Sequence, residues 1–210
     1  MQLQEALTQT KLSLMTRICD EADWGFGWLQ EEAVERCSHA LAEAGRVWLV
    51  DPVEAPGVEG RVRALGEPAG VIQLLDRHSR DCAAFAERLG VPLHEVPFGG
   101  VPRAPFDPIR ILGNRFWQEV ALWWPEQKAL ICADALGTGR FFRAGDERLG
   151  LHPLLRAVPP RALERFAPRH VLCGHGEGVH GDEAAPALEE ALRTARRRFP
   201  RLLVSLARRR

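Results

Sequence analysis

Apolar residues fall into short runs separated by polar, glycine-rich or proline-rich breaks, a pattern typical of alternating strands and helices. Runs that predict strands lie at residues 24–29, 47–50, 71–75, 92–96, 109–112, 116–124, 128–133 and 170–173. Amphipathic spacing and end signals predict helices at residues 57–65, 81–89, 159–166 and 183–199. The order divides into two halves that each contain strands and helices. We therefore expect an α/β (α+β) fold in which two sheets pack face to face with helices outside.

One stretch, residues 34–41, fits two structures. Val34, Cys37 and Leu41 have helical spacing, and helix propensity favours this interpretation. The same stretch could instead be the first arm of a hairpin that turns at Gly45. We predict the strand, on the family resemblance described below.

Composition and charge narrow the class of protein only slightly. Of the 210 residues, 46% are hydrophobic and 27% charged, as in an ordinary globular protein. We expect one domain over residues 1–210, with an N-terminal extension at 1–20 and a basic tail at 201–210. The formal net charge is zero, which does not point to a nucleic-acid or membrane partner. Arginines gather near the C-terminus, but the lack of aromatic residues after Phe199 argues against nucleic acid.

The cysteines and the apolar runs indicate the cellular compartment in which the protein works. The five cysteines are odd in number, widely spread and free of any CxxC pair, which predicts reduced thiols. No apolar run approaches the length that spans a bilayer, and the first residues lack the pattern of a signal peptide. We therefore expect a cytoplasmic protein with no membrane partner.

Three predicted strands end abruptly in polar or glycine-rich turns. The first ends in Asp76-Arg77-His78-Ser79-Arg80-Asp81-Cys82, the second in Asp134, and the third in Gly174-His175-Gly176. Loops at strand ends are where rigid scaffolds present functional groups. Histidine, aspartate and cysteine are ligands that zinc prefers, and zinc lowers the pKa of a coordinated water to about 7, which supplies hydroxide at neutral pH. A metal-dependent hydrolase would gather these side chains for that reason.

These segments resemble the metallo-β-lactamase superfamily over residues 24–195. Asp134 in Cys-Ala-Asp-Ala-Leu resembles the family's bridging-aspartate turn, and His175 in Leu-Cys-Gly-His-Gly resembles its terminal histidine turn. Val47–Asp51 resembles an early strand ending in aspartate, which is why residues 34–41 are predicted as the strand before it. The resemblance implies a four-layered αββα sandwich and metal-dependent hydrolysis of an ester, lactone, thioester or phosphoester.

The metal motif departs from the family pattern His-x-His-x-Asp-His. Aligned from the left, only His78 remains, with Asp81 at the last ligand position; aligned from the right, Asp81 and Cys82 replace Asp-His. Asn114 stands where another histidine is expected. The resemblance then implies a reduced, mononuclear site with one zinc, iron or manganese ion. Its ligands would be Asp134, His175 and either His78 or Cys82, with Asp81 nearby.

A second hypothesis is a metal-free descendant of the fold. Arg77 and Arg80 flank His78 and could pair with the neighbouring aspartates or bind a small anionic ligand, with Asn114 beside them. This hypothesis predicts no cofactor and no hydrolase activity. A third hypothesis, association with nucleic acid through the basic tail, has weaker support. His39 has no motif around it, and we predict a packing or hydrogen-bonding residue there. His180 in Gly-Val-His-Gly-Asp is a secondary site candidate, for which we predict an exposed loop residue.

Overall fold

The computed structural model describes residues 16–207, which form two large β-sheets. The first sheet contains six strands in chain order, β1 (Thr16–Ala22), β2 (Gly25–Gln30), β3 (Cys37–Glu43), β4 (Arg46–Val50), β5 (Glu67–Gln73) and β6 (Leu93–Glu95). The second contains five strands in the order β13 (Val179–His180), β12 (His170–Cys173), β9 (Ala129–Cys132), β8 (Trp117–Trp124) and β7 (Asp107–Asn114). A separate two-stranded ribbon is formed by β10 (Leu136–Gly137) and β11 (Gly150–Leu151).

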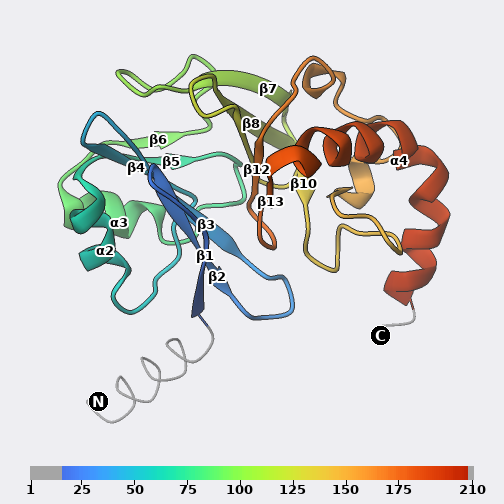
Figure 1. Cartoon of the computed structure of the whole chain (residues 1–210), viewed down its shortest axis with the longest axis horizontal. Helices are drawn as coiled ribbons and strands as arrows, with labels where there is room; N and C mark the ends of the chain where they lie inside the picture. Colours follow the sequence, from blue (N-terminus) through green and yellow to red (C-terminus); the bar gives the residue numbers. More distant parts are fainter. Residues whose placement is uncertain (1–15, 208–210) are drawn as a thin grey trace, which may run out of the picture.

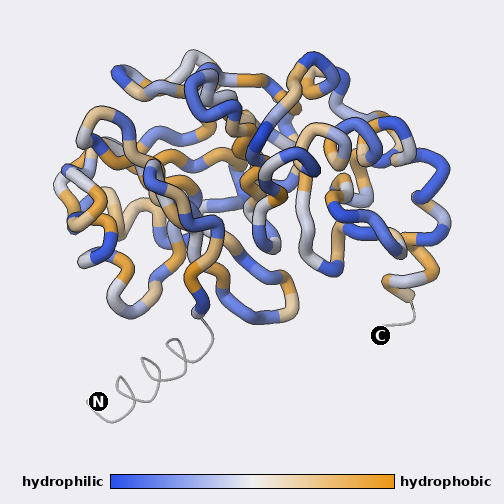
Figure 2. The backbone as a smooth tube through the Cα atoms, viewed as in Figure 1, coloured by the Kyte–Doolittle hydropathy of each residue, from blue (hydrophilic) through white to orange (hydrophobic). Residues whose placement is uncertain are grey.

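Helices cover the outer faces of both sheets (Figure 1). The short helices α2 (Val58–Leu65) and α3 (Cys82–Leu89) pack on β5, while the long helix α4 (Ala184–Ala207) packs beside β11, β12 and β13. One hydrophobic cluster fills the space between the sheets, and a second lies beneath α2 and α3. Hydrophobic and hydrophilic segments alternate along α4, as expected for a helix with one buried face (Figure 2). The predicted four-layered αββα sandwich is thus confirmed.

Residues 37–43 form a strand, β3, in agreement with the hairpin prediction. The turn to β4 uses Ala44 and Gly45, whose φ angles of 49° and 75° are both left-handed, as a two-residue hairpin turn requires. Most of β3 is buried, so its apolar residues serve both faces of the sheet. The helical spacing is therefore a coincidence: Cys37 and Leu41 belong to a strand that is buried on both sides, and Val34 lies in the exposed turn before it.

The boundaries of three predicted segments need correction. Strand β1 begins inside the predicted N-terminal extension, and Ile18 pairs with Trp28 of β2. In place of the helix predicted at 159–166, the structure has only a 3₁₀ turn at Arg161–Leu163. The backbone of Pro160 before it is extended, and the last hydrogen bond of the turn runs from the Glu164 N–H to the Arg161 carbonyl oxygen. Helix α4 continues past Pro200 into the predicted basic tail, with Leu202 buried against the body of the protein. Residues 1–15 and 208–210 lie outside the described part.

The remaining connections include two further 3₁₀ turns, at Pro153–Leu155 and Gly181–Glu183. Along residues 16–207, no helix combines the length and apolar character needed to cross a membrane.

The two sheets are joined by backbone pairing at one edge. Residues after β5 leave the first sheet, so that Leu75 bridges Glu119 of β8. On the other side, Arg36, just before β3, bridges His175, just after β12. The Arg80 guanidinium reinforces this joint by donating to carbonyl oxygens of both sheets, at 2.7 to 2.9 Å, on Cys37, Asp51 and Gly174.

Replacing Arg80 with methionine should weaken this joint. Methionine keeps much of the side-chain volume but leaves the carbonyl groups without their charged donor. We expect the free energy of unfolding to fall by about 3 kcal/mol, the upper end for a hydrogen bond to a charged group. Urea unfolding measures the change. Arg63→Met, which breaks only the exposed pair with Glu59, should cost less than about 0.5 kcal/mol; equal losses in both variants would contradict this account.

Candidate metal centre

Three side chains from separate strand ends converge at the joint between the sheets. Asp134 Oδ1 lies 3.1 Å from His78 Nε2 and 3.2 Å from His175 Nε2, and the two histidine nitrogens are 3.4 Å apart. His78 follows β5, Asp134 follows β9 and His175 follows β12. The structure thus brings together one member of each of the three polar turns found in the sequence.

The hydrogen bonds behind the two histidines define which nitrogen carries a proton. His78 Nδ1 lies 2.8 Å from Asp51 Oδ2, a carboxylate oxygen that can only accept. His175 Nδ1 lies 2.5 Å from the carbonyl oxygen of Val34, which also can only accept. Both neutral rings therefore carry their proton on Nδ1, and both Nε2 lone pairs face Asp134 Oδ1.

Asp51 has a second task at the end of β4. Its Oδ1 accepts a hydrogen bond from the Leu74 backbone N–H at 2.9 Å, and its backbone has a left-handed φ of 45°. The same carboxylate thus fixes the end of β5 and the ring of His78. A carboxylate that holds the outer nitrogen of a histidine is the usual support of a metal-binding imidazole.

Glu119 holds the turn that carries Asp134. Its side chain is fully buried, and Oε1 accepts from the backbone N–H groups of Asp134 at 3.0 Å and Ala135 at 2.8 Å. Oε2 accepts from the indole N–H of Trp117 at 2.8 Å. Burial raises the pKa of Glu119 to about 7, although these donors and the nearby His78 oppose the rise.

The geometry of this group fits one divalent ion. Ligand atoms about 2.0–2.1 Å from a tetrahedral ion are separated by about 3.3 Å, close to the three observed distances. Asp134 Oδ1 is buried and makes no contact with hydrogen-bond geometry within the described residues. Three lone-pair atoms that face one another in a buried place repel unless a proton or a metal ion lies between them. His78, Asp134 and His175 therefore suit a metal as three ligands with a position left open.

The charges around the group also favour a cation. Burial raises the pKa of Asp134, but the imidazoles of His175 and His78 outweigh it and hold that pKa far below its usual range. For His78, burial and the Arg80 charge lower the pKa, while Asp51 and Asp134 raise it, with a net rise. Asp134 is thus a charged carboxylate at neutral pH, as a ligand must be.

Aromatic and apolar side chains surround the group. Phe142 stacks on the His175 ring at 5.4 Å between centroids, and His152 lies edge-on to Trp117 at 4.8 Å. Burial lowers the pKa of His152 to about 4, although the charge of Asp134 raises it, so the ring is neutral at pH 7. Phe141 and Val34 are exposed beside these residues. The setting is therefore partly apolar.

A buried ion pair supports Phe142 from behind. The Arg156 guanidinium donates to Glu147 Oε1 at 3.0 Å and Oε2 at 2.5 Å, and it also donates to the Phe142 carbonyl oxygen at 2.6 Å. Both side chains are almost fully buried. Because an unpaired charge would be costly there, this pair fixes the backbone of the ring that stacks on His175.

The other predicted metal ligands lie outside the group. Asp81 Oδ2 accepts a hydrogen bond from the Glu54 backbone N–H at 2.7 Å and so holds the loop after β4. Cys82 is buried under α3 in the apolar cluster, and its Sγ lies 3.5 Å from the His78 carbonyl oxygen. Burial raises the pKa of this thiol far above its usual range. Of the two alignments of residues 76–82, the structure agrees with the one that retains His78.

The predicted anion-binding residues have partners of their own. Arg80 is committed to the backbone carbonyls of the sheet joint. Arg77 donates to the Phe116 carbonyl at 3.0 Å and lies over the Trp117 ring. Asn114 is exposed, and its Oδ1 accepts from the backbone N–H groups of Phe116 and Trp117, which shapes the turn between β7 and β8. The structure does not bring Asn114 and Arg80 to one ligand.

Comparisons with known proteins agree with this architecture. The metallo-β-lactamase DIM-1 is 14% identical in sequence, with a TM-score of 0.57 over 86% of this chain and 97% of the other. The metallo-β-lactamase FIM-1 from Pseudomonas aeruginosa, in its mono-zinc form, is 10% identical, with a TM-score of 0.57 over 88% and 97%. ETHE1 from Myxococcus xanthus is 15% identical, with a TM-score of 0.52 over 81% and 89%.

No protein-family profile matches the sequence, and no curated protein is similar to it. The structural similarities nevertheless extend over most of the chain, in agreement with the layers and strand ends described above. The chain therefore has the metallo-β-lactamase fold, which confirms the resemblance found in the sequence.

Three supporting groups were not assigned a role from the sequence. Asp51 was identified only as the end of an early strand, and no role was assigned to Glu119 or to the Val34 carbonyl. A glutamate that alternates with Trp117 and Ala121 on one face of an apolar strand is the signal that could have indicated Glu119, because buried carboxylates need donors. Asp51 acts through the segment that follows β5, and the Val34 carbonyl through a contact between the sheets.

Glu119→Gln tests the support of the Asp134 turn. The amide oxygen can still accept from Asp134 and Ala135, but the new NH₂ group then faces the Trp117 indole N–H, so one buried donor loses its acceptor. We expect the free energy of unfolding to fall by about 1–3 kcal/mol, measured by urea unfolding. Gln118→Glu, the reverse exchange at the exposed neighbouring position, should change it by less than about 0.5 kcal/mol. An unchanged stability in Glu119→Gln would refute this role.

Proposed function

We propose that the protein is a metal-dependent hydrolase whose single ion is held by His78, Asp134 and His175. The observation that carries the proposal is the triangle of lone pairs, with both histidine tautomers fixed so that Nε2 faces Asp134 Oδ1. Zinc is the first choice, since two imidazoles and a carboxylate suit it, and iron or manganese are the alternatives. The structure of FIM-1 in a mono-zinc form supports the idea that this fold can hold a single zinc ion.

Residues of the chain would orient the attacking water and donate a hydrogen bond to the substrate. The ion, when bound, supplies a Lewis acid that lowers the pKa of a coordinated water to about 7. Asp134 has a second carboxylate oxygen that can accept a hydrogen bond from the attacking water and orient it. His152 Nδ1 accepts from the Leu154 backbone N–H at 3.3 Å, so its proton lies on Nε2, where it can donate to a substrate oxygen. Water then adds to the acyl or phosphoryl centre, and the leaving oxygen or sulfur takes up the proton.

The surroundings favour a small substrate with an apolar part. Val34 and Phe141 are exposed apolar residues near the metal ligands: the Val34 carbonyl oxygen contacts His175, and Phe141 packs beside Phe142, which stacks on His175. Arg77 has an exposed side chain and lies over the Trp117 ring, which contacts His152, and its cation could attract an anionic group of the substrate. An ester, lactone, thioester or phosphoester fits these conditions. The five free cysteines agree with the expected reducing cytoplasm.

The metal-free alternative has less support. It requires Arg77, Arg80 and Asn114 to bind an anion, whereas Arg80 and Asn114 are occupied with backbone groups. It also leaves the buried Asp134 Oδ1 beside His78 and His175 with no contact of hydrogen-bond geometry among the described residues.

Metal content tests the proposal directly. Asp134→Asn and His175→Ala should each lose the ion bound at this site, because two remaining ligands hold it weakly. Hydrolysis of an ester, lactone and phosphoester panel should fall to background in both. The measurements are the metal bound per chain, by mass spectrometry on protein purified without added chelator, and the turnover of the panel.

Two matched variants show which alignment of residues 76–82 applies. Asp81→Asn and Cys82→Ala remove the rival ligands but leave the triangle intact, so both should retain metal and activity. Loss of metal in either, with retention in Asp134→Asn, would refute the assignment. A wild-type chain that binds no metal after reconstitution would refute the proposal itself.

Asp51→Asn tests the tautomer argument. Asparagine tolerates the left-handed backbone, and its oxygen can still accept from Leu74. Its NH₂ group would then donate to His78 Nδ1 and move the ring proton to Nε2, the atom that faces the metal. We expect the metal dissociation constant to rise about 10–100-fold, as for other supporting residues of metal sites. Competition with a chromogenic chelator measures it, and an unchanged constant would contradict the tautomer argument.

A further inference from the structure

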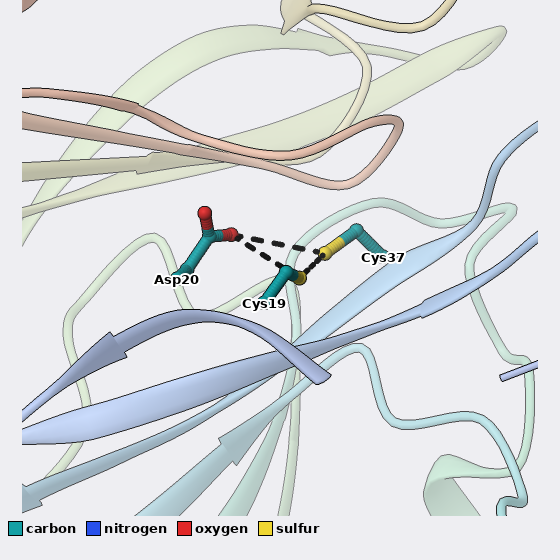
Figure 3. Close-up of side chains that lie close together, drawn as sticks. All are labelled: Cys19, Asp20 and Cys37. Carbon is teal, nitrogen blue, oxygen red and sulfur yellow. Dashed lines mark hydrogen bonds between the residues drawn. The ribbon is translucent and has the colours of Figure 1, made fainter. Parts of the chain in front are cut away.

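A second group of metal-ligand side chains lies away from His78, Asp134 and His175. Cys19 and Asp20 of β1 face Cys37 of β3, as Figure 3 shows, and His39 of β3 lies beside them. The side chains of Asp20 and His39 are each 2% exposed, and both thiols are buried. This group thus offers two sulfurs, one nitrogen and one oxygen in a closed setting.

Distances within the group match a tetrahedral zinc site. The thiol sulfurs are 3.6 Å apart, Cys37 Sγ is 3.7 Å from His39 Nε2, and His39 Nε2 is 3.1 Å from Asp20 Oδ2. Asp20 Oδ2 lies 3.6 Å from Cys19 Sγ and 4.0 Å from Cys37 Sγ. Zinc–sulfur bonds of about 2.3 Å and zinc–nitrogen or zinc–oxygen bonds of about 2.0–2.1 Å place tetrahedral ligands about 3.3–3.8 Å apart. The five distances lie within about 0.5 Å of these values. Cys19, Asp20 and Cys37 form the tightest group, and His39 would have to move toward Cys19 Sγ to complete the site.

Gly27 of β2 keeps space open at the centre of the group. It pairs with Cys19 on one side and with His39 on the other, so β2 runs between the two ligand-bearing strands. A Cβ at this position would lie 3.0 Å from Cys19 Sγ, 3.0 Å from the His39 ring and 3.1 Å from Asp20 Oδ2. Glycine is needed here for space, since any side chain would press on three of the four ligands.

The two cysteines are poorly placed for a disulfide. They lie on β1 and β3, strands that β2 separates, and their sulfurs are 3.6 Å apart, whereas a disulfide bond is about 2.05 Å long. A disulfide would therefore require the two sulfurs to approach each other by about 1.5 Å. An ion, which bridges sulfurs without bonding them, fits the existing spacing.

The carboxylate of Asp20 is oriented toward the group by other contacts. Its Oδ1 accepts from the Gly178 backbone N–H and lies near His180 Nε2, both at 2.8 Å, which leaves Oδ2 facing the thiols and His39. The backbone of Asp20 has a left-handed φ of 51° at an irregularity in the β1–β2 pairing, and this turns its side chain inward. A non-glycine residue held in that conformation indicates a positional requirement.

We propose that Cys19, Asp20, Cys37 and His39 form a structural zinc site with four protein ligands. With all four positions filled by protein, the site has no open coordination position and would carry no chemistry. It therefore goes beyond the hydrolase proposal and does not depend on it.

The location of this site gives it a mechanical role. It ties β1 to β3, which are not neighbours in the sheet, and Asp20 extends the tie to Gly178 in the loop after His175. The Cys37 N–H donates to the Gly174 carbonyl at 2.9 Å, on the other side of His175. Zinc bound here would hold both ends of the segment that carries a ligand of the candidate metal centre.

The test uses the full chain with Asp134→Asn, which removes the first site and leaves the second. Loaded with Co²⁺, this protein should bind one ion per chain and show a thiolate-to-cobalt charge-transfer band. Adding Cys19→Ser and Cys37→Ser should reduce binding to none and abolish the band. The matched control adds Cys82→Ala instead, which removes a buried thiol outside the group and should leave both the ion and the band.

X-ray absorption at the zinc edge provides a measurement that needs no cysteine variant. In the zinc-loaded Asp134→Asn protein, two sulfur scatterers at about 2.3 Å and two nitrogen or oxygen scatterers at about 2.0–2.1 Å are expected. A shell of nitrogen and oxygen only, no bound metal, or a Cys19–Cys37 disulfide in the purified protein would each overturn the proposal. None of these results would affect metal binding by His78 and His175, so the two proposals can fail separately.

Discussion

The backbone pairing that joins the two sheets at one edge determines most of what the protein can do. Residues that follow β5 pair with β8, and the residue before β3 pairs with the residue after β12. Asp134 and His175 lie two residues after β9 and β12, and His78 lies in the turn that follows the bridge between Leu75 and Glu119, so these side chains are held close to hydrogen-bonded strand ends. Sites built on such rigid ends are held more precisely than sites on free loops. This explains how atoms from three distant segments lie within 3.4 Å of one another.

Negative charge accumulates at this edge, and its compensation explains the polar network. Asp51, Glu119 and Asp134 are all wholly or largely buried, and each carboxylate or its turn is held by backbone N–H donors or histidines. Arg80 contributes one positive charge nearby, but its N–H groups donate to backbone carbonyl oxygens and not to these carboxylates. A buried set of carboxylates remains underneutralised by such groups, and a divalent cation is the natural remaining partner.

Much of the fold was predictable because buried strands and short amphipathic helices leave clear patterns. Strand β1 was missed because its exposed and partly buried residues alternate without an apolar run, so only its pairing with β2 identifies it. The choice between His78 and Cys82 could not be made from the sequence, since both follow β5. It depends on how residues 76–81 turn between β8 and α3. The group around Cys19 was missed for a related reason: its ligands come from β1 and from a strand whose cysteine and histidine look like packing residues.

Gly27 constrains how this part of the sequence can change in evolution. A glycine inside a six-stranded sheet is unfavourable for strand formation, and here it leaves space for three neighbouring side chains. Selection then acts on Gly27, Cys19 and Cys37 together. A lineage that lost either cysteine would gain by refilling the gap with alanine or valine, whereas a lineage that kept both could not. Divergent descendants should accordingly fall into two groups, with glycine and both thiols inherited together or abandoned together.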